Sequence, residues 1–196
     1  MKKALLKRRT RYEFSPETPS LEEISQLLWA AQGITSPSGL RTAPSAGALY
    51  GLHLYVLTGG APSLSCGVYL FDTQVHDLIK VFGEDRREAV ASSFFQTWAA
   101  NGALMIVVCG FEGQISQKYG NRGKRYLLLE TGHAVQNLLL QATGLGLNTG
   151  LIGAFREEEL ASCLSLREGE EPLYVVSIGY PPKVVPGQEE HENQSH

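Results

Sequence analysis

The sequence of 196 residues predicts an α+β domain in which helices pack around one sheet. Two continuous apolar runs, at residues 103–110 and 173–179, are typical of strands covered on both faces. Apolar residues recur at helical spacing in two other stretches, residues 21–33 and 126–143. A chain of this length can bury one sizeable core, so we expect a single domain over residues 1–186.

The first helix and the segment after it have clear local signals. Ser20 followed by Glu23 matches a capping box, and apolar residues then recur at helical spacing until Gly33. Residues 34–51 are rich in Thr, Ser, Pro and Gly, and this segment is too long for a simple turn in a compact domain. Because loops of this kind often carry function, we expect functional residues there.

Four segments read as strands. Residues 53–58 and 67–72 are separated by Gly59, Gly60 and Pro62, and we expect them to form a hairpin-like pair. Residues 103–110 have flanking glycines and suit a central strand, and residues 173–179 show the same apolar pattern.

Two further helices complete the expected domain. Tyr126 to Thr143 predicts a long helix whose broad apolar surface indicates burial on most sides. That breadth suits a helix that also meets a second subunit, and burial inside one chain explains it about as well. A short helix is expected from Arg156 to Leu164. Residues 187–196 contain no apolar side chain and predict a disordered tail.

Composition restricts the function classes. Hydrophobic residues make up 43% of the chain and the net charge is -3, which argues against a nucleic-acid-binding or membrane-surface protein. No stretch approaches the roughly 20 apolar residues of a membrane span. Cys66, Cys109 and Cys163 are far apart, so we expect reduced thiols, a cytoplasmic protein and no metal site. His53 and His133 have no partner at ligand spacing and are expected to be structural.

Three short segments suit parts of an anionic cofactor. Arg8-Arg9-Thr10-Arg11 offers guanidinium groups that match phosphate oxygens, although a basic head can equally be a solvated arm. The glycines in PSAGA (residues 44–48) and GLIGA (residues 150–154) would let backbone N–H groups approach a planar ring, unless both are ordinary glycine loops. Because GxGxxG, GxxxxGK[ST] and GxSxG are missing, a Rossmann fold, a P-loop and the commonest serine hydrolases are disfavoured.

The whole set resembles the FMN-dependent nitroreductase-like proteins, and more closely their SagB-type dehydrogenase branch. The resemblance spans nearly the entire chain, and the order and spacing of its segments make it specific. These segments are RRTRYEF at 8–14, LLWAAQG at 27–33, RTAPSAGALYGLHLYVL at 41–57, GVYLFD at 67–72, KYGNRGKRYLLLETGHAVQNLLLQATGLGLNTGLIGAF at 118–155 and IGYP at 178–181.

This resemblance implies a nitroreductase-like fold, with a central, mostly antiparallel sheet flanked by helices, and an intertwined homodimer with two FMN sites at its interface. Arg8, Arg9 and Thr10 would contact the phosphate and ribityl chain. The other subunit would contribute Pro44, Ser45, Ala46 and Gly47, and the backbone of Leu151, Ile152 and Gly153 would lie along the ring. Lys183 is the candidate for a further basic phosphate contact after the last strand.

Two positions bear on the reaction. Many relatives have a basic residue where this chain has Tyr12, and Arg11 or Arg41 is a candidate to replace it. SagB-like azoline oxidases have a Lys-Tyr pair that maps onto Lys118 and Tyr119, which would serve as the catalytic base. An exposed loop without a catalytic role explains the same two residues about as well.

The expected function is hydride transfer through bound FMN, with a small molecule or a modified peptide as substrate. Two reactions compete: reduction of nitroaromatics or quinones by NAD(P)H, and oxidation of azoline rings in a peptide. The alternative from another class is a flavin-binding partner or scaffold, without turnover, in a peptide-modifying complex.

Overall fold

The computed structural model describes residues 1–95, 98 and 101–183. Its centre is a six-stranded sheet in the order β3-β2-β1-β4-β6-β5, and all five neighbouring pairs are antiparallel. The strands are β1 (Leu52–Thr58), β2 (Gly67–Asp72), β3 (Asp77–Phe82), β4 (Leu104–Phe111), β5 (Asn148–Ile152) and β6 (Glu170–Gly179). The fold is therefore α+β with one antiparallel sheet, as the sequence predicts.

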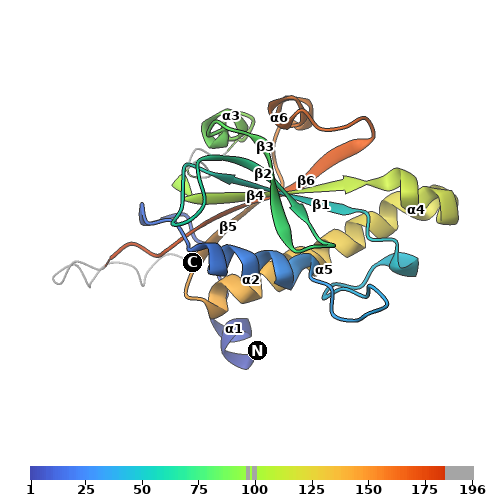
Figure 1. Cartoon of the computed structure of the whole chain (residues 1–196), viewed down its shortest axis with the longest axis horizontal. Coiled ribbons are helices and arrows are strands. Elements are labelled where there is room, and N and C mark those ends of the chain that lie inside the picture. Colours follow the sequence, from blue (N-terminus) through green and yellow to red (C-terminus); the bar gives the residue numbers. More distant parts are fainter. Residues whose placement is uncertain (96–97, 99–100, 184–196) are drawn as a thin grey trace, which may run out of the picture.

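Helices cover both faces of this sheet (Figure 1). One face packs against α2 (Leu21–Gln32) and α5 (Gly123–Gly144), and the other packs against α3 (Arg87–Ala91) and α6 (Glu157–Leu164). Helix α4 (Glu112–Tyr119) follows β4 at one end of the sheet, and the short α1 (Lys2–Lys7) lies outside α2 and α5. Because both faces are covered, β4 is buried over its first seven residues, which explains its continuous apolar run.

Most local expectations are confirmed. Ser20 and Glu23 form the capping box that starts α2, with each side chain bonded to the other residue's backbone N–H. Strands β1 and β2 form the expected antiparallel pair, and α6 begins one residue after the expected helix start. The segment between α2 and β1 is irregular apart from the single turn Ala46–Ala48.

Three expectations need correction. Residues 150–152 of the GLIGA segment are not a glycine loop, because they belong to the edge strand β5. Lys118 and Tyr119 end helix α4 instead of lying in a loop. Helix α5 is less buried than its apolar breadth indicated, since Leu128 and Leu129 are about half exposed in this single chain.

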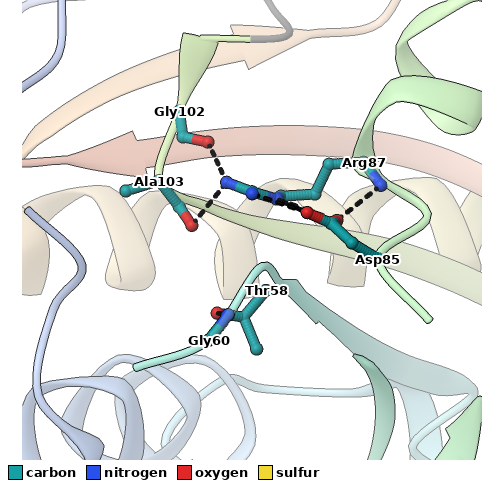
Figure 2. Close-up of polar contacts among 6 residues, drawn as sticks. All are labelled: Thr58, Gly60, Asp85, Arg87, Gly102 and Ala103. Atoms are coloured by element: carbon teal, nitrogen blue, oxygen red, sulfur yellow. Dashed lines mark hydrogen bonds and ion pairs between the residues drawn. The ribbon is translucent and has the colours of Figure 1, made fainter. Parts of the chain in front are cut away.

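Arg87 fastens the start of β4 to α3 (Figure 2). Its guanidinium donates to the carbonyl oxygens of Gly102 and Ala103 at 3.0 and 2.9 Å, and it pairs with Asp85 at 2.7 Å. A side chain at Gly59 would collide with this guanidinium, because an added Cβ would lie 2.2 Å from it. The contact therefore joins the end of β1, the start of α3 and the start of β4.

A second polar contact pairs His53 with a carboxylate that lies far from it in the sequence. Its Nδ1 lies 2.8 Å from Glu170 Oε1, and the Tyr55 hydroxyl donates to the other oxygen at 3.1 Å. Burial acts to raise the pKa of Glu170, but hydrogen bonds from His53, the Arg167 backbone and Tyr55, together with the His53 charge, lower it overall. Burial and the Glu170 charge raise the pKa of Tyr55.

The ends of the chain and its helices complete the description. The expected domain limit at residue 186 and the expected tail 187–196 lie outside the described residues. None of the described helices is long and apolar enough to cross a membrane. Among the described residues there is no group of three or more His, Cys, Asp or Glu side chains that could hold a metal ion.

Candidate functional site

The N-terminal basic segment lies along the outer edge of β5. The Arg11 N–H donates to the Thr149 carbonyl at 2.9 Å, Thr10 forms a parallel bridge with Thr149, and the Asn148 amide donates to the Glu13 carbonyl at 3.0 Å. The structure therefore brings Arg8, Arg9 and Thr10 next to the strand that carries Leu151 and Ile152. We call these residues, 8–11 and 149–153, the arm group.

The edge of β5 presents backbone groups in the arm group. Residues of a strand alternate in the side to which their N–H and C=O point. Because the Thr149 carbonyl points outward to Arg11, the N–H and C=O of Leu151 point to the same open edge. A Cβ at Gly150 would lie 2.4 Å from the Trp98 ring, so this close packing requires a glycine. Gly153 follows the strand and is exposed.

Trp98 and Tyr12 form an aromatic pair beside the same edge. Their ring centroids are 4.5 Å apart, so the Tyr12 side chain, at the position where the resemblance implies a basic residue, packs on a ring. The two candidates to replace that basic residue differ in position. Arg11 lies in the arm group, whereas Arg41 donates to Gln32 Oε1 at 2.6 Å, beneath the loop before β1.

The cations near the arm differ in availability. The Arg9 guanidinium donates to the carbonyls of Leu6 and Arg8, so its position is fixed by the end of α1. Lys183 pairs with Glu17 at 2.7 Å, and that hydrogen bond raises the pKa of Lys183. Within the described part of the chain, the Arg8 and Arg11 side chains make no salt bridge.

The PSAGA segment meets the Lys-Tyr pair at another place. Gly47 has a left-handed φ of 62°, and a Cβ added to it would lie 2.7 Å from the Tyr119 hydroxyl and 2.8 Å from Lys118 Nζ. Residues far apart in the sequence therefore converge here. We call Pro44, Ser45, Ala46 and Gly47 together with Lys118 and Tyr119 the loop group; Pro44, Gly47 and Lys118 are exposed, and the others are half-buried.

A buried polar cluster supports the loop group from below. The Ser45 hydroxyl donates to Glu130 Oε2 at 2.5 Å and accepts the Tyr50 N–H at 2.9 Å. Glu130 is 1% exposed, and burial raises its pKa against the opposing effects of Ser45, the Gly51 backbone, Arg41 and His133. Sequence reasoning missed Glu130, although a carboxylate inside the apolar run YLLLETGHAV is the signal that would have found it.

The two groups lie apart in one chain. Glu130, which holds Ser45, precedes the end of α5 at Gly144 by 14 residues, or about 21 Å of helix, and β5 begins only after that end. Figure 1 shows the loop before β1 and α4 at one end of the sheet, away from α1 and the start of β5. One chain therefore does not bring all the expected site residues together.

Comparisons with known proteins agree with this fold. The model of a protein family described as "Nitroreductase family" matches residues 5–180. A protein of Methanocaldococcus jannaschii named as a candidate nitroreductase is 34% identical over 176 residues, which cover 89% of this chain and 88% of that protein. The trifolitoxin operon protein TfxC of Rhizobium leguminosarum bv. trifolii is 27% identical, and the match covers 89% of this chain but 54% of TfxC.

Solved structures give the same result. A candidate nitroreductase from Ralstonia eutropha has a TM-score of 0.82 and 26% identity, with 93% of this chain and 83% of that chain covered. A chain of the Escherichia coli microcin synthetase McbBCD complex with truncated pro-MccB17 has a TM-score of 0.77 at 22% identity, which covers 92% of this chain and 73% of that chain and shows a shared fold. Because the family model covers most of the sequence and the fold agrees, this chain belongs to the nitroreductase family.

Proposed function

We propose that this oxidoreductase uses FMN and works as a homodimer that holds each flavin between two copies of the chain. The separation of the two groups carries the proposal. The arm group has cations and backbone edge groups, the loop group has a candidate base, and one chain keeps them apart. A two-fold partner would place its loop group against the arm group of the first copy.

Exposed apolar side chains support such a dimer. Leu128 and Leu129 on α5 are 49% and 52% exposed, and Trp29 on α2 is 47% exposed. A groove of about 380 Å³ lies among α1, α2 and α5, and Trp29 and Leu140 line it. A family member that left these surfaces in water would lose the favourable free energy of burying them, so a second copy is the occupant that we propose.

The residues present fit FMN. Arg8, Arg9 and Thr10 would hold the phosphate and ribityl chain. One guanidinium can donate two parallel hydrogen bonds to two phosphate oxygens, and Arg8 has no competing salt bridge among the described residues. The open edge at Leu151, followed by Ile152 and Gly153, would supply backbone donors to the ring. Lys183 would have to leave Glu17 before it could reach a phosphate.

Bound FMN would supply the hydride acceptor and pass electrons to a second substrate, with NAD(P)H as one donor. The chain's own contribution is position and proton transfer. Lys118 Nζ and the Tyr119 hydroxyl lie together beside Gly47, where Lys118 would accept a substrate proton as hydride leaves that substrate. This arrangement favours dehydrogenation of an azoline-like ring in a modified peptide as the specific reaction, in the SagB-type branch.

The test is an absorbance spectrum of the protein incubated with FMN and then titrated without oxygen. We expect the protein to bind FMN, and we expect an azoline-containing peptide to reduce and so bleach the bound flavin. Lys118→Ala should abolish that bleaching, whereas Lys124→Ala on the neighbouring α5 should not. Fast bleaching by NADPH that survives Lys118→Ala would instead support the nitroreductase reaction, because hydride transfer from a nicotinamide needs no protein base. No flavin binding at all would reject the proposal, and flavin that binds but cannot be reduced would indicate the non-catalytic alternative.

A further inference from the structure

The strongest feature that the proposed function leaves unused is the buried polar cluster beneath the PSAGA loop. In the described part of the chain, three buried side-chain atoms have no hydrogen-bond partner, namely Gln32 Nε2, Arg41 Nε and Glu130 Oε1. They belong to one cluster, since Arg41 donates to Gln32 Oε1 and interacts electrostatically with Glu130. A buried ion with an unpaired oxygen costs free energy, and such sites often have a function.

Ser45 connects this cluster to the outer side of the PSAGA loop. Its oxygen has one hydrogen to donate and two lone pairs to accept with. When Glu130 is ionised, the Ser45 hydrogen is directed to Oε2, at a distance of 2.5 Å that is typical of a charge-assisted bond. The Tyr50 N–H occupies one lone pair. Ser45 then has only an acceptor left for the outer side of the loop.

Protonation of Glu130 reverses this assignment. A neutral carboxyl can donate its own hydrogen to Ser45, so both lone pairs of Ser45 are filled by Glu130 and Tyr50. The Ser45 hydrogen is then free to point out of the loop. The proton comes from solvent and forms an O–H bond on the Glu130 carboxyl; apart from that proton transfer, only hydrogen bonds change.

We propose that Glu130 is a positioning residue that decides, by gaining or losing one proton, whether Ser45 offers a hydrogen-bond donor to the flavin. The proposal rests on the proposed function, because it assumes that the PSAGA loop approaches FMN in a partner copy. The polar groups of a flavin are mostly acceptors, so a donating Ser45 should bind it more tightly. FMN binding should therefore be accompanied by proton uptake at Glu130.

The groups around Glu130 are suited to a change of charge. Arg41 faces it from the loop, with Tyr50 beside Arg41, and His133 faces it from α5 itself. The neutral Gln32 adjoins from α2, while Lys118 and Tyr119 of α4 lie across Gly47. Burial favours the neutral carboxyl, whereas the Ser45 bond, the Gly51 backbone and Arg41 favour the ion, and the pKa of Glu130 is raised overall.

The test is the dissociation constant of FMN, measured from flavin fluorescence quenching between pH 5 and 9 in four proteins. For the wild type we expect FMN affinity to rise about tenfold as the pH falls, beyond the change that the variants show. At low pH Ser45 donates a hydrogen bond to a flavin acceptor, whereas at high pH two acceptors face each other. Glu130→Gln keeps the shape and donates at every pH, so it should bind at the tight level throughout. Ser45→Ala should bind at the weak level throughout, and the exposed Glu158→Gln of α6 should match the wild type.

The FMN phosphate titrates near pH 6, but it does so in all four proteins, so the differences between profiles isolate Glu130. Parallel profiles for the wild type and Glu130→Gln would overturn this inference and leave the proposed function intact. Absence of FMN binding in every protein at every pH would instead overturn the proposed function. If Glu130→Gln does not fold, calorimetry of the wild type in two buffers of different ionisation enthalpy decides. Net proton uptake on binding at pH 7–8 supports the inference, and zero uptake overturns it.

Discussion

Gly47 is the position at which backbone conformation and site chemistry can be separated by mutation. An alanine there must adopt a left-handed φ of 62°, which costs about 1–2 kcal/mol of folding free energy. Its Cβ would also lie 2.7 Å from the Tyr119 hydroxyl and 2.8 Å from Lys118 Nζ, so both groups must retreat toward an ordinary contact of 3.4 Å or more. We expect Gly47→Ala to lose about 1–2 kcal/mol of stability, and displacement of this size to slow flavin reduction by the azoline-containing peptide on the order of tenfold to 100-fold.

Gly39 is the matched control in the same loop. It has a φ of 81°, and nothing lies within 4 Å of an added Cβ, so Gly39→Ala should have a similar stability cost without touching Lys118 or Tyr119. Urea unfolding measures the stability of both variants, and stopped-flow absorbance measures the reduction of bound flavin. Equal reduction rates in the two variants, at equal stability loss, would refute the role assigned to the contact between Gly47 and the Lys-Tyr pair.

Three further outcomes follow from the structure. Arg87→Ala should lower the unfolding free energy in urea by about 2–3 kcal/mol, because it leaves two partly buried carbonyls unpaired, and Arg87→Lys should recover only part of that loss. The pKa of Glu170 is lowered in the folded state, so its contact with His53 stabilises the protein above the unfolded pKa. This stability is lost as the pH falls through the folded pKa. Glu170→Gln should therefore flatten the acidic part of the plot of unfolding free energy against pH, measured in urea. Tyr12→Lys should raise the flavin midpoint potential in spectroelectrochemistry, because a cation would stabilise the reduced anionic ring; an unchanged or lower potential would contradict this.

The sequence predicted those parts of the fold whose signals are local. The capping box of Ser20 and Glu23 lies within four residues, and the apolar run of β4 directly reflects a strand covered on both faces. The strand pair of β1 and β2 followed from the intervening glycines and proline.

Tertiary contacts decided the rest. The strand β5 contains a glycine that local propensity assigns to a loop, and its pairing with β6 and the packing of Trp98 on Gly150 override that propensity. His53 and Glu170 are 117 residues apart, so no spacing rule could pair them. The approach of Gly47 to Lys118 likewise depends on how the loop folds over α4 and α5.

The central claim is that each flavin is held by the arm group of one copy and the loop group of another. Arg8→Glu damages the arm group, and Gly47→Asn damages the loop group with a residue that tolerates a left-handed backbone. Each variant alone should lose FMN binding.

The direct measurement is the FMN content of mixed dimers, purified with two different affinity tags after co-expression of these variants. Each mixed dimer contains one intact arm group facing one intact loop group, so the account predicts one FMN per two chains. Mixed dimers without bound FMN, or a wild-type monomer that binds FMN at full affinity, would contradict it.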